Sequence, residues 1–447
     1  MRHPLSSHQP SDAIAHRRGG TITAGQFHQE ALDLAGELPA GAYIINSCQD
    51  RYLFMLGFAA AALAGKTTLM PSSFAPKTIS QLQAAYPGLV CLHDGRDRAP
   101  GLPEMQIAAR PSASLPSAAA PLLDAEHIAA IVFTSGSTGE PTAHAKSWGR
   151  LCVNGAAESE RLRASGVAIV ATVPPQHMYG FESSVLLALQ GGASIWHGKP
   201  FYPADIVEVL AALPRPGMLV TTPFHLSTLL DSGLPLPPCD MVLSATAPLA
   251  LPLAERAEKG FSAPLLEIYG CTESGQVASR RPVEDPAWQL LPGVQMRTDN
   301  EGAWVYGGHV EGEVQLSDHI APQGSDRFVL LGRHADMVNI VGKRTSIAHL
   351  NAQLQSIPGV VDGCFLQPDE APASADGSDS VQRLAALIVA PELNPETLLD
   401  ELRARIDPVF LPRPLIRVDA LPRNATGKLV RSDLLALYVA HKPPARS

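Results

Sequence analysis

Residues 131–141 read Ile131-Val-Phe-Thr-Ser-Gly-Ser-Thr-Gly-Glu-Pro141. A short apolar run leads directly into a loop that contains four hydroxyl side chains and two glycines. Glycine lets backbone N–H groups approach an anion closely, and the Ser and Thr hydroxyls add further hydrogen-bond donors. We therefore interpret this stretch as a buried strand followed by a phosphate-binding loop, in preference to a plain turn between a strand and a helix.

Strand-like and helix-like patterns alternate on both sides of this loop. Strands are expected at 43–46, 67–71 and 89–92, with helices at 52–65 and 79–85, and the alternation resumes from 128 to about 267. This order predicts an α/β fold of layered sheets and helices. Shorter strands are expected beyond 276, a connector at 96–121, and a frayed leader at 1–30.

Composition narrows the class of protein. The chain has 447 residues, of which 45% are apolar, so it can bury a large core divided over several subdomains. Its net charge of −9 argues against general binding to nucleic acid. The longest apolar run, 53–65, is too short to span a bilayer, and no secretory signal is visible. Six scattered cysteines without a C-x-x-C pair predict a reducing, cytoplasmic location.

The segment Thr134-Ser-Gly-Ser-Thr-Gly-Glu-Pro141 resembles the signature loop of the adenylate-forming superfamily. That superfamily includes acyl- and aryl-CoA synthetases, the adenylation domains of nonribosomal peptide synthetases, and firefly luciferase. Lys usually follows the proline in this family; here Thr142 stands there, with His144 and Lys146 close behind. The resemblance implies that the ATP β- and γ-phosphates are held by Thr134, Ser135, Gly136, Ser137, Thr138 and Gly139.

Two further segments follow in the family's order. Pro174-Pro-Gln-His-Met-Tyr-Gly180 resembles the Pro-x-x-His-x-x-Gly segment, whose His borders the acid pocket, and Ser244-Ala-Thr-Ala-Pro248 resembles the small-residue turn along the adenine. The resemblance implies nucleotide contacts at Ala245, Thr246, Ala247 and Pro248. It implies a substrate pocket lined by His177, Met178, Tyr179, Phe181, Ser244, Gly270 and Gly275.

The segment Tyr269-Gly-Cys-Thr-Glu273 resembles the family's Tyr-Gly-x-Thr-Glu motif. The Tyr269 ring can stack on adenine, beside Gly270. Thr272 can donate a hydrogen bond to the α-phosphate. Glu273 is an oxygen ligand suited to Mg²⁺, which favours carboxylates together with phosphates.

Two residues are expected at the ribose. The segment from Glu311 ends in Asp318 and resembles the family's ribose-binding segment, and Leu331-Gly-Arg333 resembles its Gly-Arg, whose arginine reaches ribose and phosphate. The residues after Arg333 resemble the family's hinge, with Ala335 where Asp or Lys is common.

The segment Leu421-Pro-Arg-Asn-Ala-Thr-Gly-Lys428 resembles the family's C-terminal catalytic-lysine motif. The resemblance implies that Lys428 stabilises the charge redistributed at the α-phosphate. It also implies a large N-terminal adenylation domain at 1–334, shortened at its start, and a small mobile α+β lid at 335–447. The expected catalytic residues are Lys428, Thr272, Glu273 and His177.

These resemblances imply an ATP- and Mg²⁺-dependent ligase that converts a small carboxylic acid to an acyl-adenylate and then to a thioester. The acceptor is the phosphopantetheine thiol of CoA or of a holo acyl carrier protein, and the basic C-terminal stretch suits either. Similarity to ligases of bacterial aryl-polyene pigment clusters, including Lys146-Ser-Trp148, favours a hydroxybenzoate-like aryl acid. Three alternatives remain: a medium-chain or other fatty acid ligase, a non-catalytic relative that binds nucleotide or acid, and a luciferase-like oxidoreductase.

Overall fold

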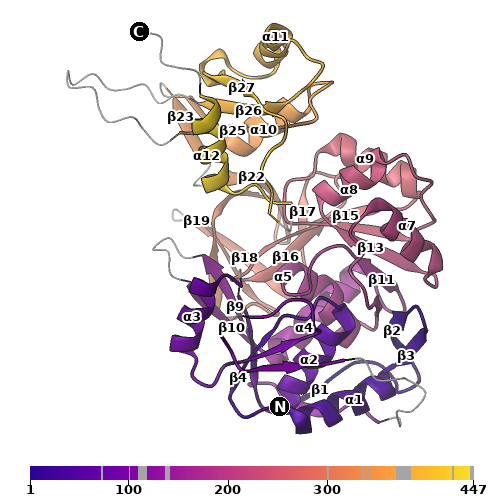
Figure 1. The fold of residues 1–447 in the computed structure, drawn as a ribbon. Helices are drawn as coiled ribbons and strands as arrows, with labels where there is room; N and C mark the ends of the chain where they lie inside the picture. The colour runs from indigo at the N-terminus through magenta and orange to yellow at the C-terminus, as the bar shows by residue number, and fades with distance from the viewer. Residues whose placement is uncertain are drawn as a thin grey trace.

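The computed structural model describes residues 1–71, 74–99, 101–108, 118–135, 141–299, 302–333, 337–340, 343–368, 384–424 and 427–442. Within these residues the chain builds layered sheets flanked by helices, so the predicted α/β class is confirmed (Figure 1). The last elements of the chain lie together at one end of the molecule, and the N-terminus lies near the other.

Residues 1–30 are folded, so the expectation of a frayed leader is wrong. The Thr23 hydroxyl accepts from the Gln26 backbone N–H while the Gln26 side chain accepts from the Thr23 N–H, which forms a capping box. One strand of this region joins the largest sheet, with Ala15 opposite Ile195. The local sequence does not reveal that strand, because its partner lies far along the chain. The elements are β1 (Arg2–Pro4), β2 (Ala13–Arg17), β3 (Gly20–Thr23) and α1 (Ala24–Glu37).

A second sheet contains β9, the strand that leads into the predicted phosphate-binding loop. Within the described ranges its strand order is β10-β9-β5-β4-β6-β7, with β9 parallel to β5 and antiparallel to β10. The strands and helices expected between 43 and 92 are confirmed to within a few residues. The elements are β4 (Tyr43–Asn46), α2 (Arg51–Leu63), β5 (Thr67–Met70), α3 (Pro76–Ala85), β6 (Val90–His93), β7 (Glu104–Gln106), β8 (Leu122–Asp124), β9 (Ile128–Ser135) and β10 (Pro141–Ser147).

The largest sheet of the described residues has the strand order β21-β22-β17-β16-β15-β14-β13-β11-β12-β2-β3. Its central strands β11, β13, β14 and β15 are parallel. Its strands from β11 to β15 and the helices around them are α4 (Trp148–Leu162), β11 (Ala168–Ala171), α5 (Met178–Gly180), η2 (Phe181–Leu186), α6 (Leu187–Gln190), β12 (Ser194–Trp196), α7 (Pro203–Ala212), β13 (Gly217–Thr221), α8 (Pro223–Asp231), β14 (Met241–Ser244), α9 (Leu251–Phe261) and β15 (Leu265–Cys271).

Beyond residue 274 the structure is mainly strands, as the turn-rich sequence predicts. Strands β18, β19 and β20 form a small sheet of their own. The elements are β16 (Gly275–Arg280), β17 (Trp288–Leu290), β18 (Val294–Asp299), β19 (Gly302–Gly307), β20 (Glu313–Leu316), β21 (Asp318–Pro322) and β22 (Arg327–Arg333).

The C-terminal elements pack into two apolar clusters that contain only residues between 338 and 438. Helix α10 begins where the Ser346 hydroxyl accepts from the His349 N–H, a standard N-cap. The elements are β23 (Met337–Ile340), β24 (Lys343–Ser346), α10 (Ile347–Gln355), β25 (Asp362–Leu366), β26 (Ala385–Val389), α11 (Pro395–Arg405), η4 (Pro408–Phe410), β27 (Leu415–Arg417) and α12 (Arg431–His441).

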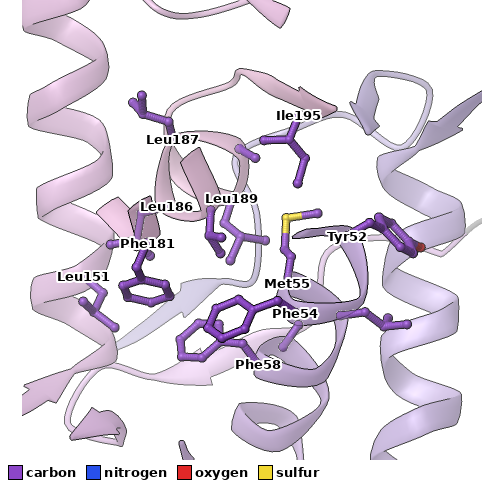
Figure 2. Close-up of a cluster of buried hydrophobic side chains, with 14 of the residues drawn as sticks. Tyr52, Phe54, Met55, Phe58, Leu151, Phe181, Leu186, Leu187, Leu189 and Ile195 are labelled. Carbon is purple, nitrogen blue, oxygen red and sulfur yellow. The ribbon is translucent and has the colours of Figure 1, made fainter. Parts of the chain in front are cut away.

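Helix α2 occupies the centre of the main core, where Phe54 and Phe58 meet Phe181 edge-on at centroid distances of 6.3 and 5.0 Å (Figure 2). The buried helix predicted for 52–65 is therefore confirmed. At its start Arg51 is completely buried and donates to the Ala171 and Val173 carbonyls. This fixes the chain that leaves β11. In the part of the chain that the structure describes, no helix is long and apolar enough to cross a membrane.

Candidate active site

The candidate site lies at the carboxyl edge of the largest sheet. His177 follows β11, Ser244 ends β14, and Thr272 and Glu273 form the turn between β15 and β16. Because β11, β14 and β15 run parallel, their carboxyl ends meet at one edge. In open α/β sheets, ligands bind in the crevice outside that edge.

The segment expected to line the acid pocket is held by one hydrogen bond within itself and by one to β14. His177 Nδ1 accepts from the Tyr179 backbone N–H at 3.3 Å, and the Tyr179 hydroxyl donates to the Leu243 carbonyl at 2.9 Å. The neighbouring Ser244 Oγ is buried and has no hydrogen-bond partner among the described residues. A buried polar atom is normally satisfied, so this hydroxyl is available to a ligand.

The adenine-side turn after β14 has a strained backbone. Thr246 has φ of +81°, a conformation that a β-branched residue rarely adopts. Its neighbours Ala245 and Ala247 have small side chains, which leave room beside the turn. Strain of this kind collects at ligand sites because the surrounding structure must impose it.

Two glycines shape the hairpin that carries Thr272 and Glu273. A Cβ on Gly270 would lie 2.3 Å from the Gly275 carbonyl oxygen. Gly275 has φ of +73°, and a Cβ there would lie 2.6 Å from Glu182 Oε1. Both positions therefore require glycine, which fixes how closely the hairpin approaches η2.

A buried polar network, which the sequence did not predict, supports this hairpin from beneath. Glu182 Oε1 accepts from Asn154 Nδ2 at 2.8 Å and from the Gln276 N–H at 3.2 Å. Burial raises the pKa of Glu182 to about 7, against the opposing charge of Lys146. Lys146 Nζ donates to the Glu273 carbonyl at 2.7 Å. The sequence signal for this network is an acidic residue, Glu182, within the apolar run that forms η2 and α6.

The β9–β10 pair meets the same hairpin from the other sheet. His144 Nε2 lies 3.0 Å from Thr134 Oγ1 and 3.8 Å from Glu273 Oε1. Burial lowers the pKa of His144 and also that of Lys146. The end of β9, where the phosphate loop begins, therefore lies beside the Glu273 carboxylate.

Glu273 fits a role in binding Mg²⁺. Its carboxylate is 38% exposed, so an oxygen donor faces solvent next to the start of the phosphate loop. The described residues contain no group of three or more acidic, His or Cys side chains that could hold a metal by themselves. Mg²⁺ commonly binds through one or two carboxylates together with substrate phosphates, and Glu273 offers such a carboxylate.

The two residues expected at the ribose are also adjacent. Asp318 on β21 stands directly opposite Arg333 on β22. The Tyr269 hydroxyl donates to Asp318 Oδ2 at 2.7 Å, and the Tyr269 ring packs against Trp288. The end of β15 is therefore linked to the strand pair that leads into the C-terminal elements.

Lys428 reaches this site from the C-terminal part. Burial, and to a smaller extent the charge of Lys428, lower the pKa of His177 to about 4. Gly427 packs so closely on helix α8 that a Cβ on it would lie 2.8 Å from Phe224 Cβ. Arg423 holds the base of the loop by ion pairing with Asp362 at 2.8 Å.

Some expected residues lie elsewhere or are not described. The Phe181 ring belongs to the core beside Phe54 and Phe58, so we omit it from the proposed pocket (Figure 2). Phe181 begins the π-helical turn η2, which a motif alone does not predict. Gly136, Ser137, Thr138, Gly139 and Ala335 lie outside the described residues, and the side chains of Ser135 and Arg333 are likewise not described.

Comparison with known proteins gives consistent matches. Residues 31–318 match the family described as AMP-binding enzyme. The chain is 30% identical to the 4-coumarate–CoA ligase of Halorhodospira halophila, over 68% of this chain and 76% of that ligase. ATP-bound MatB from Rhodopseudomonas palustris has the same fold, with a TM-score of 0.79 at 20% identity over 96% of both chains. The O-succinylbenzoate coenzyme A synthetase of Bacillus subtilis, in complex with ATP and magnesium, gives 0.78 at 17% identity over 97% of this chain and 99% of that one.

Proposed function

The chain belongs to the family of AMP-binding enzymes, and we propose that it activates a small aryl carboxylic acid, first as the acyl-adenylate and then as a thioester. Its general activity is that of an AMP-forming acid–CoA ligase that uses ATP and Mg²⁺. The identity of the acid, the site residues and the second acceptor are parts of the proposal.

A carboxylate resists attack by a thiol, and ATP removes that resistance in two steps. The carboxylate oxygen attacks the α-phosphorus and pyrophosphate leaves; the thiol then attacks the acyl carbon and AMP leaves. Glu273, together with the ATP phosphates, would hold Mg²⁺, whose charge would offset that of the departing pyrophosphate. We expect Lys428 to donate to the α-phosphate and the acid carboxylate, and Thr272 to donate to the α-phosphate. Asp318 accepts from the ribose hydroxyls.

The observation that carries the proposal is the seating of the Lys428 loop at the carboxyl edge of the largest sheet, where a Cβ on Gly427 would lie 3.5 Å from Thr222 Oγ1, directly after β13. The charge of Lys428 also acts on His177, so this loop brings positive charge to the side of the sheet where the acid carboxylate and the α-phosphate are expected to meet. A protein that only binds nucleotide has no use for this arrangement. His177 remains neutral at pH 7 because its pKa is about 4, so it adds no competing charge.

An aryl acid is supported by a relative and by the proposed pocket. The 30% identical relative is named for 4-coumarate, an aromatic acid. Met178 and Tyr179 are buried, and the Tyr179 hydroxyl donates to the carbonyl of Leu243. The next residue is Ser244, whose unpartnered hydroxyl can hydrogen-bond a polar substituent. These features favour an aromatic ring with a hydroxyl group over a long acyl chain.

We propose CoA as the acceptor and a holo acyl carrier protein as the second candidate. Two arginines of the basic C-terminal stretch already have partners within the chain. Arg417 donates to the Leu393 carbonyl, and Arg423 pairs with Asp362. Less positive charge is therefore available to an acceptor than the sequence predicts. We also propose that residues 335–447 act as a lid. Their separate apolar clusters support that boundary.

The test is acid-dependent ATP–pyrophosphate exchange over a panel of aryl, short-chain and long-chain acids. CoA and a holo carrier protein are then offered separately, and the thioester is identified by mass. We expect the largest exchange with hydroxylated aryl acids. Preference for long-chain acids would contradict the aryl proposal, and nucleotide binding without any exchange would contradict catalysis itself.

A further inference from the structure

Strand β10 presents a row of polar side chains toward the Glu273 hairpin. Alternate residues of a strand lie on one face, so Thr142, His144 and Lys146 belong to the same face of β10. The register places Thr142 directly opposite Thr134, at the end of β9. This row therefore begins opposite Thr134 and ends at Lys146, whose Nζ donates to the Glu273 carbonyl.

Lys146 is fully engaged within the protein. Only 4% of its surface is exposed, and Nζ donates to the Glu273 carbonyl at 2.7 Å. The carboxylates of Glu182 and Glu311 also act on its charge. Its ammonium group thus positions the backbone of Glu273 and does not extend toward a ligand above the hairpin.

His144 is placed differently. Its side chain is 18% exposed, and Nε2 lies 3.0 Å from Thr134 Oγ1 and 3.8 Å from Glu273 Oε1. The imidazole therefore stands between the start of the phosphate loop and the carboxylate that fits Mg²⁺. An oxygen of a polyphosphate bound between Thr134 and Glu273 would lie within reach of this ring nitrogen.

We propose that His144 is a further ATP-binding residue, whose Nε2–H donates a hydrogen bond to the β- or γ-phosphate and then to the departing pyrophosphate. The inference rests on the proposed function, because it assumes that ATP binds with its phosphates at this loop. Thr142 stands where the family usually has a lysine, and its side chain carries no charge. The proposal gives the role of hydrogen-bond donor to the phosphates to His144 instead. This hydrogen bond contributes to the binding of ATP and of pyrophosphate. AMP has no β- or γ-phosphate and therefore cannot accept it.

The test compares equilibrium binding of ATP, pyrophosphate and AMP to the full chain carrying His144→Ala. We expect about tenfold weaker binding of ATP and of pyrophosphate, as for loss of a hydrogen bond to a charged group, and AMP affinity within twofold of the unchanged protein. Thioester formation from supplied acyl-adenylate should also stay within twofold, since that step has no pyrophosphate.

His144→Gln, which restores an N–H donor, should recover most of the ATP affinity, whereas His144→Leu should not. If His144→Ala fails to fold, as judged by circular dichroism, the Leu and Gln pair carries the comparison. Equal weakening of ATP and AMP would show a structural role and overturn the proposal, as would unchanged ATP and pyrophosphate affinity. Absence of exchange and of nucleotide binding in the unchanged protein would instead refute the proposed function.

Discussion

At the scale of single residues, Lys428 sits on a turn that is fixed at its base. The Asn424 side chain accepts from the Lys428 backbone N–H at 2.9 Å, and Gly427 N–H donates to the Asn424 carbonyl at 2.8 Å. The Arg423 guanidinium joins the same turn to Asp362. The backbone that carries the lysine is thus held in place on the side of Asn424 and Asp362.

Replacing Lys428 by Ala should lower the adenylation rate by about 10²–10³-fold, the loss typical for one electrostatic donor to a transition state. Thioester formation from supplied acyl-adenylate should fall far less. The measurement is the rate of each half-reaction, with Lys442→Ala as the control because Lys442 is an exposed cation of the same part. Equal losses in both half-reactions would contradict the role assigned to Lys428.

Glu158 makes stability depend on pH. Its carboxyl accepts from the Ser183 hydroxyl at 2.6 Å, and burial raises its pKa from 4.5 to about 8. Between those values the folded chain retains a proton that the unfolded chain releases, so this group makes stability fall as pH rises through that window. Its contribution to the slope is at most about 1.4 kcal/mol per pH unit.

Glu158→Gln, which cannot ionise, should therefore flatten the loss of stability between pH 5.5 and 8 in urea unfolding. The matched control is Glu160→Gln on the same helix, where the side chain is exposed and the slope should be unchanged. A slope in Glu158→Gln as steep as that of the unchanged protein would refute the assignment.

At the scale of elements, helix α4 approaches η2 and α6 unusually closely. A Cβ on Gly155 would lie 2.8 Å from the Leu186 carbonyl oxygen and 2.9 Å from Gln190 Cβ. This contact positions η2, which carries Glu182 beneath the hairpin of Thr272 and Glu273. A change in the packing of these helices is therefore expected to shift Glu182 and, through its hydrogen bonds, the hairpin of Thr272 and Glu273.

Gly155→Ala should destabilise the protein by about 1–3 kcal/mol, because the added methyl group cannot be accommodated without moving one helix. Gly36→Ala is the matched control: it also lies in a helix, with nothing within 4 Å of the added atom, and should stabilise by up to about 1 kcal/mol. Urea unfolding of both variants gives the comparison. Similar effects of the two substitutions would show that helix propensity, and not close packing, governs position 155.

Several elements could be predicted from sequence because their signals are local. Strand β9 and the buried helix α2 follow from apolar patterns, and the turn at Thr272 follows from a short motif. The contact of Lys146 with Glu273 and the network around Glu182 could not be predicted, since their partners lie far apart in sequence. The contact of the Phe181 ring with Phe54 and Phe58 in the core could not be predicted either, since those partners precede it by more than 120 residues.

At the scale of the whole molecule, the C-terminal part contacts the large part through the Lys428 loop. Gly427, with φ of +77°, lies against Phe224 at the start of α8, and the Arg423 guanidinium stands over the Phe224 ring at 5.8 Å. Docking of the C-terminal part in this position therefore depends on a glycine that meets an aromatic side chain.

Gly427→Ala should slow adenylation by at least about tenfold, because the added Cβ prevents the loop from seating and misplaces Lys428. Thioester formation from supplied acyl-adenylate should be nearly unchanged. Gly312→Ala is the control, since Gly312 also has positive φ, +71°, but nothing lies within 4 Å of its added atom. If both variants lose adenylation equally, backbone strain and not docking is the cause.

The pairing of β2 with β12 has a consequence for synthesis of the protein. Ala15 leaves the ribosome early, but its partner Ile195 is made about 180 residues later. At a synthesis rate of about 5–20 residues per second, strand β2 remains without its partner β12 for roughly 10–40 s. During that interval the nascent chain exposes a template for aggregation. The yield of folded enzyme should therefore depend on chaperone capacity and translation speed as much as on the stability of the finished fold.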